Sequence, residues 1–408
     1  MPPNVADAFV LVFTFGMSLK GWKQAGLLGR EWAMYREVLK RYGSLVLVTY
    51  GDAEDLNTLR EVCTPEEAAK VHLVCNERQI NIMEYMARLP ELVNEKLRDA
   101  RRVVVKTNQM VGGEAAVRLT EWLRLQGKDV GLVARGGYLW TRFVTHEHGP
   151  HSEAADDAGL RERLLCQAAD VVVGTTSEMV SDLSWRYGLN PARTRVVPNY
   201  VLTDFDPVPA SDRDPGLILF AGQLIARKRV DLLVRAIADL PEDKREKVKL
   251  VVVGEGPEKR TLEQLAMSLG APLEFLPRMP HHELLSLMSR CTIYAQASDL
   301  EGQPKTVLEA MASGAVVIVA HTPGLGDVVE HGATGLRLPS DPEAFATAIG
   351  ELLNDVDWRE MLGTAASRVT RARFGIQAIL PRELEVHALA LAVGTEHVGV
   401  QSAKRRAG

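Results

Sequence analysis

The sequence predicts an α/β protein of two domains, each with a parallel sheet covered by helices on both faces. Short apolar runs alternate with helical patterns along the 408 residues, and strands that alternate with helices in this way form parallel sheets. The alternation stops at a stretch rich in Pro and Asp, residues 204–216, and restarts at Leu217. A chain of this length is long for one domain, whereas each of two domains can bury most of its apolar surface.

The first domain is predicted over residues 1–203, with 204–216 as the linker. Its first apolar run, AFVLVFTFGM at 8–17, is too short to span a bilayer and has no basic residue before it. We therefore expect a buried strand rather than an anchor or a signal peptide. Further runs of strand length follow at 45–49, 103–106, 130–134 and 171–174.

The second domain is predicted over residues 217–374. Its most informative string, EGQPKTVLEAMASG, lies between two apolar runs of strand type, residues 290–297 and 316–320. Pro304 suits the first turn of a helix that ends near Ser313, with Gly314 as its C-cap. Helical patterns continue after residue 351, and residues 401–408 are expected to be a disordered tail.

Composition excludes several function classes. Charged residues make up 25% of the chain and the net charge is −5, without a basic stripe, so no nucleic-acid partner is expected. The four cysteines are far apart and form no metal-type or redox pair, which favours a reduced, cytoplasmic compartment. The string HEHGPH at 146–151 lacks metal-site spacing and is predicted to be a polar loop. No metal site is expected.

Two carboxylates in the informative string, Glu301 and Glu309, have the chemistry to bind a nucleotide sugar. A loop that enters a helix presents free N–H groups and the positive end of the helix dipole to a phosphate, and Gly302 allows close backbone approach. Glu309 could accept ribose hydroxyls, and Glu301 the hydroxyls of a sugar. If only their spacing is considered, the favoured interpretation is that Glu301 is a solvated loop acid and that Glu309 merely complements the helix dipole.

The surrounding chain resembles the retaining glycosyltransferases of the GT-B fold, in the group called glycosyl transferases group one. Three further stretches match that pattern in order: FAGQLIARKRVDLLVRAI from Phe220, KLVVVGEGPEKRTLEQLA from Lys249 and FLPRMPHHELLSLMSRC from Phe275. The resemblance is dense over 216–353. It implies two Rossmann-like domains with a cleft between them, and a C-terminal helix at 375–400 that crosses back to the first domain.

The resemblance also implies a function. The expected reaction is a metal-independent, retaining transfer of a sugar from a nucleoside diphosphate to a glycan or lipid-linked acceptor, without a cofactor. Lys228 and Arg227 would hold the diphosphate, and Glu301 the donor sugar. Gln223 stands where the family has an arginine, so Arg227 is expected to supply that charge. The remaining expected donor-binding residues are Gly222, Gln223, Arg278, Met279, Gly302, Gln303, Pro304, Lys305, Thr306, Val307 and Glu309.

The acceptor side is less defined. Many family members carry a histidine after the strand that here ends in Arg135, so Arg135 or a histidine of the 146–151 string is expected to replace it. Glycines after the first strand and amides after residue 106 are placed near the cleft by the resemblance. The acceptor-side candidates are Gly16, Gly21, Asn108, Gln109, Arg135, His146 and His148.

Alternatives remain open at this point. One is a nucleotide-sugar epimerase of the same fold, and the other is a non-catalytic nucleotide-sugar binding protein, which the cation missing at Gln223 allows. The GEG at 254–256 lacks the third glycine of a dinucleotide fingerprint and is predicted to make only a tight turn. Cations interleaved with Trp22 and Trp32 allow peripheral association with the inner face of a membrane, although a packed helix is favoured.

Overall fold

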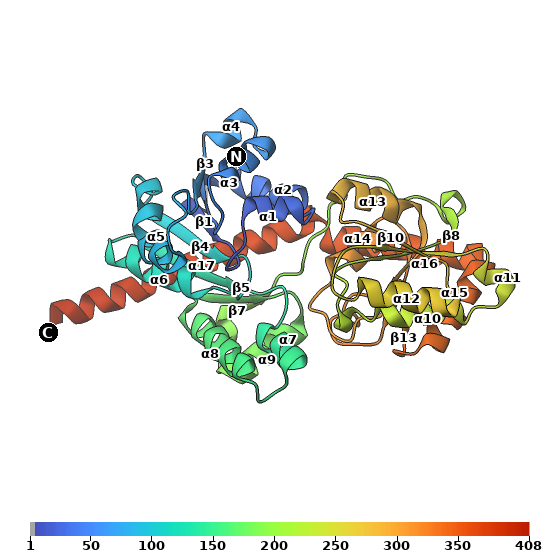
Figure 1. The fold of residues 1–408 in the computed structure, drawn as a ribbon. Helices are drawn as coiled ribbons and strands as arrows, with labels where there is room; N and C mark the ends of the chain where they lie inside the picture. The colour runs from blue at the N-terminus through green and yellow to red at the C-terminus, as the bar shows by residue number, and fades with distance from the viewer. Residues whose placement is uncertain (1–4, 408) are drawn as a thin grey trace. The chain divides into compact units, whose positions relative to one another are not determined.

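The computed structural model describes residues 5–407, with side chains as far as Glu396. It forms two compact units, one made of the chain up to Pro198 together with the segment from Leu380 onward, and the other of Asn199–Ile379. Each unit is α/β with its own parallel sheet (Figure 1). The predicted fold class is therefore confirmed for each unit.

The first unit is built on a parallel sheet in the order β3-β2-β1-β4-β5-β6-β7. Its strands are β1 (Ala6–Val12), β2 (Tyr42–Val48), β3 (Val71–Val74), β4 (Arg102–Thr107), β5 (Asp129–Arg135), β6 (Val171–Gly174) and β7 (Thr194–Val196). The strand order reverses between β1 and β4, and ligands of open α/β sheets bind at the carboxyl ends of strands at such a point. The helices are α1 (Leu19–Gln24), α2 (Leu28–Leu39), α3 (Glu54–Val62), α4 (Pro65–Ala68), α5 (Ile82–Lys96), α6 (Glu114–Leu125), α7 (Trp140–His148), α8 (Glu153–Ala168) and α9 (Ser177–Tyr187).

The tryptophans of the first unit belong to its core. Trp22 and Trp32 are only 3% and 2% exposed, and Trp22 stacks on Phe13 with ring centroids 4.1 Å apart. Burial of these rings contributes to stability through the apolar area that they remove from water. The packed-helix interpretation of this segment is confirmed. Within the described part of the chain, no helix is long and apolar enough to cross a membrane.

The last helix, α17 (Ile376–Ala407), packs on the first unit over much of its length. A Cβ added at Gly131 of β5 would lie 2.4 Å from the backbone of Ala390, and one added at Gly394 would lie 2.1 Å from the Val130 oxygen. Glycines on both sides thus allow helix and strand backbones to approach closely. The predicted crossing helix is confirmed as a helix that returns to the first unit.

The predicted tail differs from the structure. Residues 401–407 continue α17, where we expected disorder from residue 401. The sequence there is rich in Ala, Lys and Arg, which are good helix formers, and extending an existing helix avoids the cost of nucleation.

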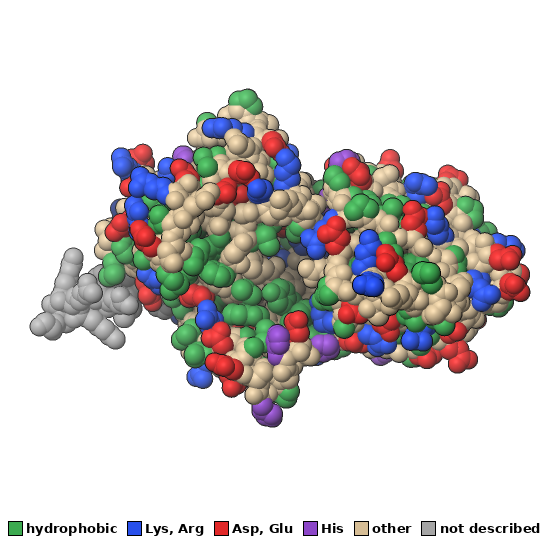
Figure 2. Space-filling view, viewed as in Figure 1, with side chains coloured by type: hydrophobic (Ala, Val, Ile, Leu, Met, Phe, Trp, Pro, Cys, Tyr) green, Lys and Arg blue, Asp and Glu red, His purple; other side chains and the backbone are tan. Residues whose placement is uncertain are grey.

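The second unit contains a parallel sheet in the order β10-β9-β8-β11-β12-β13. Its strands are β8 (Asp214–Ala221), β9 (Lys249–Val253), β10 (Leu273–Leu276), β11 (Cys291–Gln296), β12 (Val316–Ala320) and β13 (Leu336–Leu338). The helices are α10 (Val230–Ala238), α11 (Glu242–Arg245), α12 (Lys259–Leu269), α13 (His281–Arg290), α14 (Lys305–Ala312), α15 (Pro342–Asn354) and α16 (Val356–Phe374). On the face shown in Figure 2, basic and acidic side chains of this unit are interspersed.

The stretch predicted as a linker is packed against the second unit. Arg213 is only 4% exposed, and its guanidinium donates hydrogen bonds to the carbonyls of Met288 (3.0 Å) and Cys291 (2.9 Å). Burial lowers the pKa of Arg213 below its ordinary value. Backbone carbonyls from other parts of the unit accept hydrogen bonds from this buried charge. The composition of the stretch itself gives no sign of these contacts. The chain passes between the units earlier, at Pro198 and Asn199.

Candidate active site

The loop that follows β8 carries the predicted cations of the second unit. The Gly222 amide donates to the Val253 oxygen over 3.0 Å, and a Cβ added at Gly254 would lie 1.9 Å from the Gly222 oxygen. Gly254 also has φ +148°, a backbone conformation that favours glycine. The backbone of the GEG segment therefore packs directly against the backbone of this loop. This close packing explains why glycine is required at residue 254.

Arg229 fixes the loop where it enters α10. Its φ is 48°, in a left-handed region that costs a side-chain-bearing residue energy. The guanidinium pairs with Asp231 (3.1 Å) and with Asp299 (3.3 Å) of the loop after β11, and the Asp299 amide donates to the Arg227 oxygen over 2.9 Å. These contacts hold the Arg227 and Lys228 backbone against the loop that carries the first predicted carboxylate.

Both predicted cations, Lys228 and Arg227, lie beside Glu301. Lys228 Nζ lies 2.5 Å from Glu301 Oε1 and Arg227 lies 3.5 Å from it, and Gln296 Nε2 donates to the same oxygen over 2.9 Å. Burial disfavours the charged form of Glu301, but Lys228 and Arg227 outweigh it and hold its pKa below the ordinary value. The side chain is 8% exposed, so this is a nearly buried, ionised carboxylate with two cations beside it.

Helix α14 begins next to this cluster. Its N-cap, Pro304, makes no side-chain capping bond, so the first N–H groups retain the anion affinity of an uncapped helix start. Thr306 in the first turn donates to Gln296 Oε1 over 3.4 Å, which links the helix start to Glu301 through one amide. Gln303 is held by Asn199, whose side chain donates to the Gln303 oxygen over 2.7 Å. The start of α14 and the cations Lys228 and Arg227 therefore lie around the same site.

Glu309 lies one turn further along α14 and is 1% exposed. Its Oε1 is 2.9 Å from Nε2 of His281, the first residue of α13. A carboxylate this buried requires hydrogen-bond partners, and His281 supplies one in the tautomer that carries hydrogen on Nε2. The structure therefore places the two predicted acids in different surroundings: Glu301 among cations and Glu309 beside a histidine.

The other predicted donor-binding residues differ in how far their side chains are exposed. Gly302, Gln303 and Pro304 are buried in the loop before α14. Val307 is fully buried in the core of the unit, so its side chain is a packing residue, because this helix position faces the sheet. Gln223 and Arg278 are exposed, Met279 is half-buried, and Arg278 reaches Glu255 only at 4.0 Å.

In the first unit, several acceptor-side candidates lie at neighbouring strand ends. Asn108 Nδ2 donates to Thr14 Oγ1 over 3.5 Å, which joins the ends of β4 and β1. Gln109 Oε1 accepts from the Gly137 amide over 2.7 Å, and Arg135 donates to the Val197 oxygen over 3.2 Å. Gly16 (φ +77°) turns the loop after β1. Gly21 is placed inside α1.

The histidine string differs from the prediction. His146 and His148 lie in the last turn of α7 and are exposed, whereas we expected a loop. Helix α7 begins at Trp140, and the helical pattern of that segment extends through the histidines to Gly149, which ends it. Among residues 5–396, whose side chains the structure describes, no group of three or more His, Cys, Asp or Glu side chains is placed to hold a metal ion.

Sequence reasoning missed two residues of this site. His281 carries no local signal, because its partner Glu309 is 28 positions away. Gln296 could have been noticed, since it is the polar residue that ends an otherwise mainly apolar strand, and it bonds both Glu301 and Thr306.

Comparison with known proteins places the chain in a family. Residues 203–369 match the family model described as "Glycosyl transferases group 1". A D-inositol 3-phosphate glycosyltransferase of Xylanimonas cellulosilytica is 31% identical over 311 residues, which are 70% of this chain and 72% of that protein. The chain belongs to the glycosyl transferases group 1 family. It is therefore a glycosyltransferase.

Further similarities agree with membership of the glycosyl transferases group 1 family. The D-inositol 3-phosphate glycosyltransferase of Corynebacterium diphtheriae is 30% identical over 60% of this chain and 62% of that protein, a little under two thirds of its length. HepE of Anabaena, solved with UDP and glucose, has a TM-score of 0.72 at 17% identity and covers 93% of this chain and 98% of that one. A sucrose-phosphate synthase from Thermosynechococcus elongatus has a TM-score of 0.69 at 20% identity, over 95% of this chain and 99% of that one. Because these identities are low, the similarity to the two structures shows a shared fold, the GT-B fold, and nothing about function.

Proposed function

We propose that this glycosyltransferase moves a sugar from a nucleoside diphosphate to a glycan or lipid-linked acceptor, with retention and without a metal ion. The observation that supports this most is the convergence of Lys228 and Arg227 on Glu301, next to the uncapped start of α14. A diphosphate leaving group gains negative charge as the glycosidic bond breaks. Fixed cations and aligned N–H groups stabilise such charge without reorganisation.

Each residue then has a role in donor binding. Lys228, which pairs with Glu301 in the structure, would take the diphosphate as its partner and leave Glu301 to accept hydrogen bonds from the donor sugar. The low pKa of Glu301 suits it to accept these bonds and not to supply a proton. Glu309 would bind the ribose, with His281 fixing its carboxylate. Holding the sugar at both ends aligns its reacting carbon.

Retention is proposed to follow from attack on the face from which the diphosphate leaves. A phosphate oxygen of the leaving group takes the proton of the acceptor hydroxyl, so no protein nucleophile is required. Lys228 and Arg227 support this step because they stabilise the diphosphate in the transition state more than in the bound donor. Neither the epimerase nor the binding-protein alternative has a specific observation in its favour.

The donor assignment is tested by calorimetric titration with UDP in the presence of EDTA, because HepE was solved with UDP. Lys228→Met should weaken UDP binding about tenfold or more, since a charge-assisted contact is lost. The matched control is Lys247→Met, which removes an exposed lysine of the same unit. Equal losses in both variants, or binding that requires a divalent ion, would overturn the assignment.

Stereochemistry is tested separately, by the anomeric proton coupling in the transfer product formed from a UDP sugar of known configuration. Retention predicts the same configuration in product and donor. An inverted product would reject the proposed chemistry even if UDP binds as expected.

A further inference from the structure

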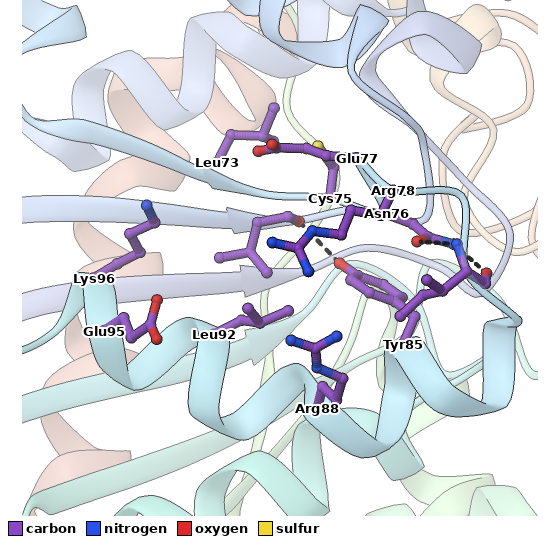
Figure 3. Close-up of a pocket in the computed structure, with 12 residues that line it drawn as sticks. Leu73, Cys75, Asn76, Glu77, Arg78, Tyr85, Arg88, Leu92, Glu95 and Lys96 are labelled. Atoms are coloured by element: carbon purple, nitrogen blue, oxygen red, sulfur yellow. Dashed lines mark hydrogen bonds between the residues drawn. The ribbon is translucent and has the colours of Figure 1, made fainter.

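A cavity of about 190 Å³ lies in the first unit, between the loop after β3 and one face of α5 (Figure 3). Strand β3 is the edge strand of its sheet, so the cavity lies beside the sheet and not over its centre. The helix residues that line it recur every three or four positions, as residues on one helical face do, and the last two of them are adjacent. They are Tyr85, Arg88, Leu92, Glu95 and Lys96.

Two arginines bring positive charge into this cavity from different elements. Arg78 extends from the loop after β3, and Arg88 from α5, on the same side of Tyr85 (Figure 3). Among the described residues Arg78 makes no ion pair, and Arg88 approaches only Glu84, at 4.0 Å. A contact at that distance between exposed groups contributes little. Both guanidiniums therefore retain their capacity to bind an anion, which a planar fork of N–H donors suits well.

The loop that carries Arg78 is held in place before any ligand arrives. Asn76 Nδ2 donates to the Ile80 oxygen over 2.8 Å, and Asn76 Oδ1 accepts from the Ile80 amide over 3.0 Å. Gln79 has φ 49°, a strained conformation for a residue with a side chain, which the closed loop maintains. A loop ordered in this way loses less conformational entropy when it binds a ligand.

The cavity has a polar and an apolar part. Leu73, Ile80 and Leu92 contribute apolar lining, and the Tyr85 hydroxyl donates to the Thr49 and Val74 oxygens, which leaves its ring as a wall. The lining acid of the helix, Glu95, lies with Lys96 at the other end from Arg78 and Arg88 (Figure 3). Glu95 is therefore separated from the two arginines by the apolar part. The other lining acid, Glu77, precedes Arg78 in the loop after β3, so two guanidiniums and one carboxylate lie at that end of the cavity.

We propose that this cavity binds a small molecule that carries a phosphate and a short apolar body. The phosphate would be held by Arg78 and Arg88, and the apolar body would lie against Leu92. This site lies in the first unit and uses none of the residues assigned to donor binding, so it stands or falls independently of the proposed function.

The proposal is tested by calorimetry on the full-length protein with hexyl phosphate, in the presence of saturating UDP to occupy the donor site. Hexanol and hexylammonium have the same apolar chain without the negative charge, and inorganic phosphate lacks the chain. Hexyl phosphate should bind more tightly than each of these. Arg78→Gln combined with Arg88→Gln should weaken its binding about tenfold to a hundredfold.

Two further variants separate the two halves of the site. Arg98→Gln removes an exposed arginine just beyond α5 and should leave the affinity for hexyl phosphate within about twofold of the original. Leu92→Ser should weaken hexyl phosphate and leave inorganic phosphate unchanged, because only the apolar contact is lost. Circular dichroism and the melting temperature confirm that each variant is folded.

Three results would overturn the proposal. Hexyl phosphate could bind no more tightly than hexanol, or the double arginine variant could bind it as well as the original protein. Binding lost in Lys228→Met but kept in the double arginine variant would place the phosphate in the donor site instead.

Discussion

At the scale of single residues, the two predicted carboxylates of the second unit differ in the groups that lie beside them. Glu301 has two cations within 3.5 Å, whereas Glu309 has His281 at 2.9 Å. The difference decides how each can serve a ligand. Charge pairing keeps Glu301 ionised, while the hydrogen bond from His281 orients Glu309.

The contact between His281 and Glu309 makes a prediction about ribose recognition. His281→Ala should weaken UDP binding about tenfold, because the buried carboxylate loses the donor that orients it. Pyrophosphate has no ribose, so its affinity should stay within about twofold. Both affinities are measured by calorimetry.

The neighbouring residue gives a matched control for this prediction. His282 is exposed, and His282→Ala should change neither affinity. If His281→Ala weakened pyrophosphate as much as UDP, the histidine would act on the whole site and not on Glu309.

The pH dependence of stability reports on Glu301. Because its folded pKa lies below the ordinary value near 4.5, the ionised pair stabilises the folded chain above that ordinary value, and this contribution is lost as pH falls through the folded pKa. Glu301→Gln should lower the unfolding free energy by about 1–3 kcal/mol at neutral pH. Urea denaturation at several pH values should show this difference shrinking as the solution becomes acidic. A difference that is independent of pH would contradict the ionised pair.

At the scale of elements, a buried polar cluster joins α17 to β4 and β2. Lys106 of β4 pairs with Glu383 of α17, and both side chains are about 5% exposed or less. His387, one turn later, lies with Nδ1 2.9 Å from the Tyr42 hydroxyl. Burial, together with Lys106 and Arg135, lowers the pKa of His387 well below its ordinary value, so this histidine is neutral near pH 7.

Removing one partner of that ion pair should be costly. Glu383→Ala leaves the Lys106 ammonium buried without its carboxylate, which should lower the unfolding free energy by about 3–5 kcal/mol. The measurement is urea denaturation followed by circular dichroism. Adding Lys106→Met to this variant should recover part of the loss, since the unpaired charge is then gone.

An adjacent acid provides the comparison. Glu385 is exposed on the same helix, and Glu385→Ala should change the unfolding free energy by less than about 0.5 kcal/mol. Similar losses for Glu383→Ala and Glu385→Ala would show that charge on α17, and not the buried pair, stabilises the helix.

At the scale of the whole molecule, each unit has its own sheet and core, and the chain passes between them twice, at Pro198 and at Ile379. The candidate donor residues all belong to the second unit, and the cavity of Figure 3 belongs to the first. Ligands of the two sites should therefore stabilise different parts of the protein.

Hydrogen exchange followed by mass spectrometry tests this separation. UDP should slow exchange most at residues 222–229 and 297–306, because it orders the loops that carry the cations and the α14 start. Hexyl phosphate should slow exchange most at residues 76–88. The same regions slowed by both ligands would contradict two separate sites.

The sequence alone determined many of the elements and brought forward part of the candidate donor site. The strand predicted at 316–320 is β12 over Val316–Ala320, and the helix predicted to end near Ser313 ends at Ala312, although its C-cap is Ser313 and not the predicted Gly314. Such features depend on local signals, because buried parallel strands are continuous apolar runs and helix ends need particular residues. Lys228 and Glu301 were predicted to belong to one site for a similar reason, since they lie in recognisable strings.

The tertiary structure decided which side chains meet. Lys228 and Glu301 are 73 positions apart, and His281 was not predicted at all. Arg213, in a stretch that composition assigned to a linker, is buried among the carbonyls of Met288 and Cys291. Such contacts arise when helices and strands far apart in the chain pack together, so their energy depends on distances that no local pattern contains.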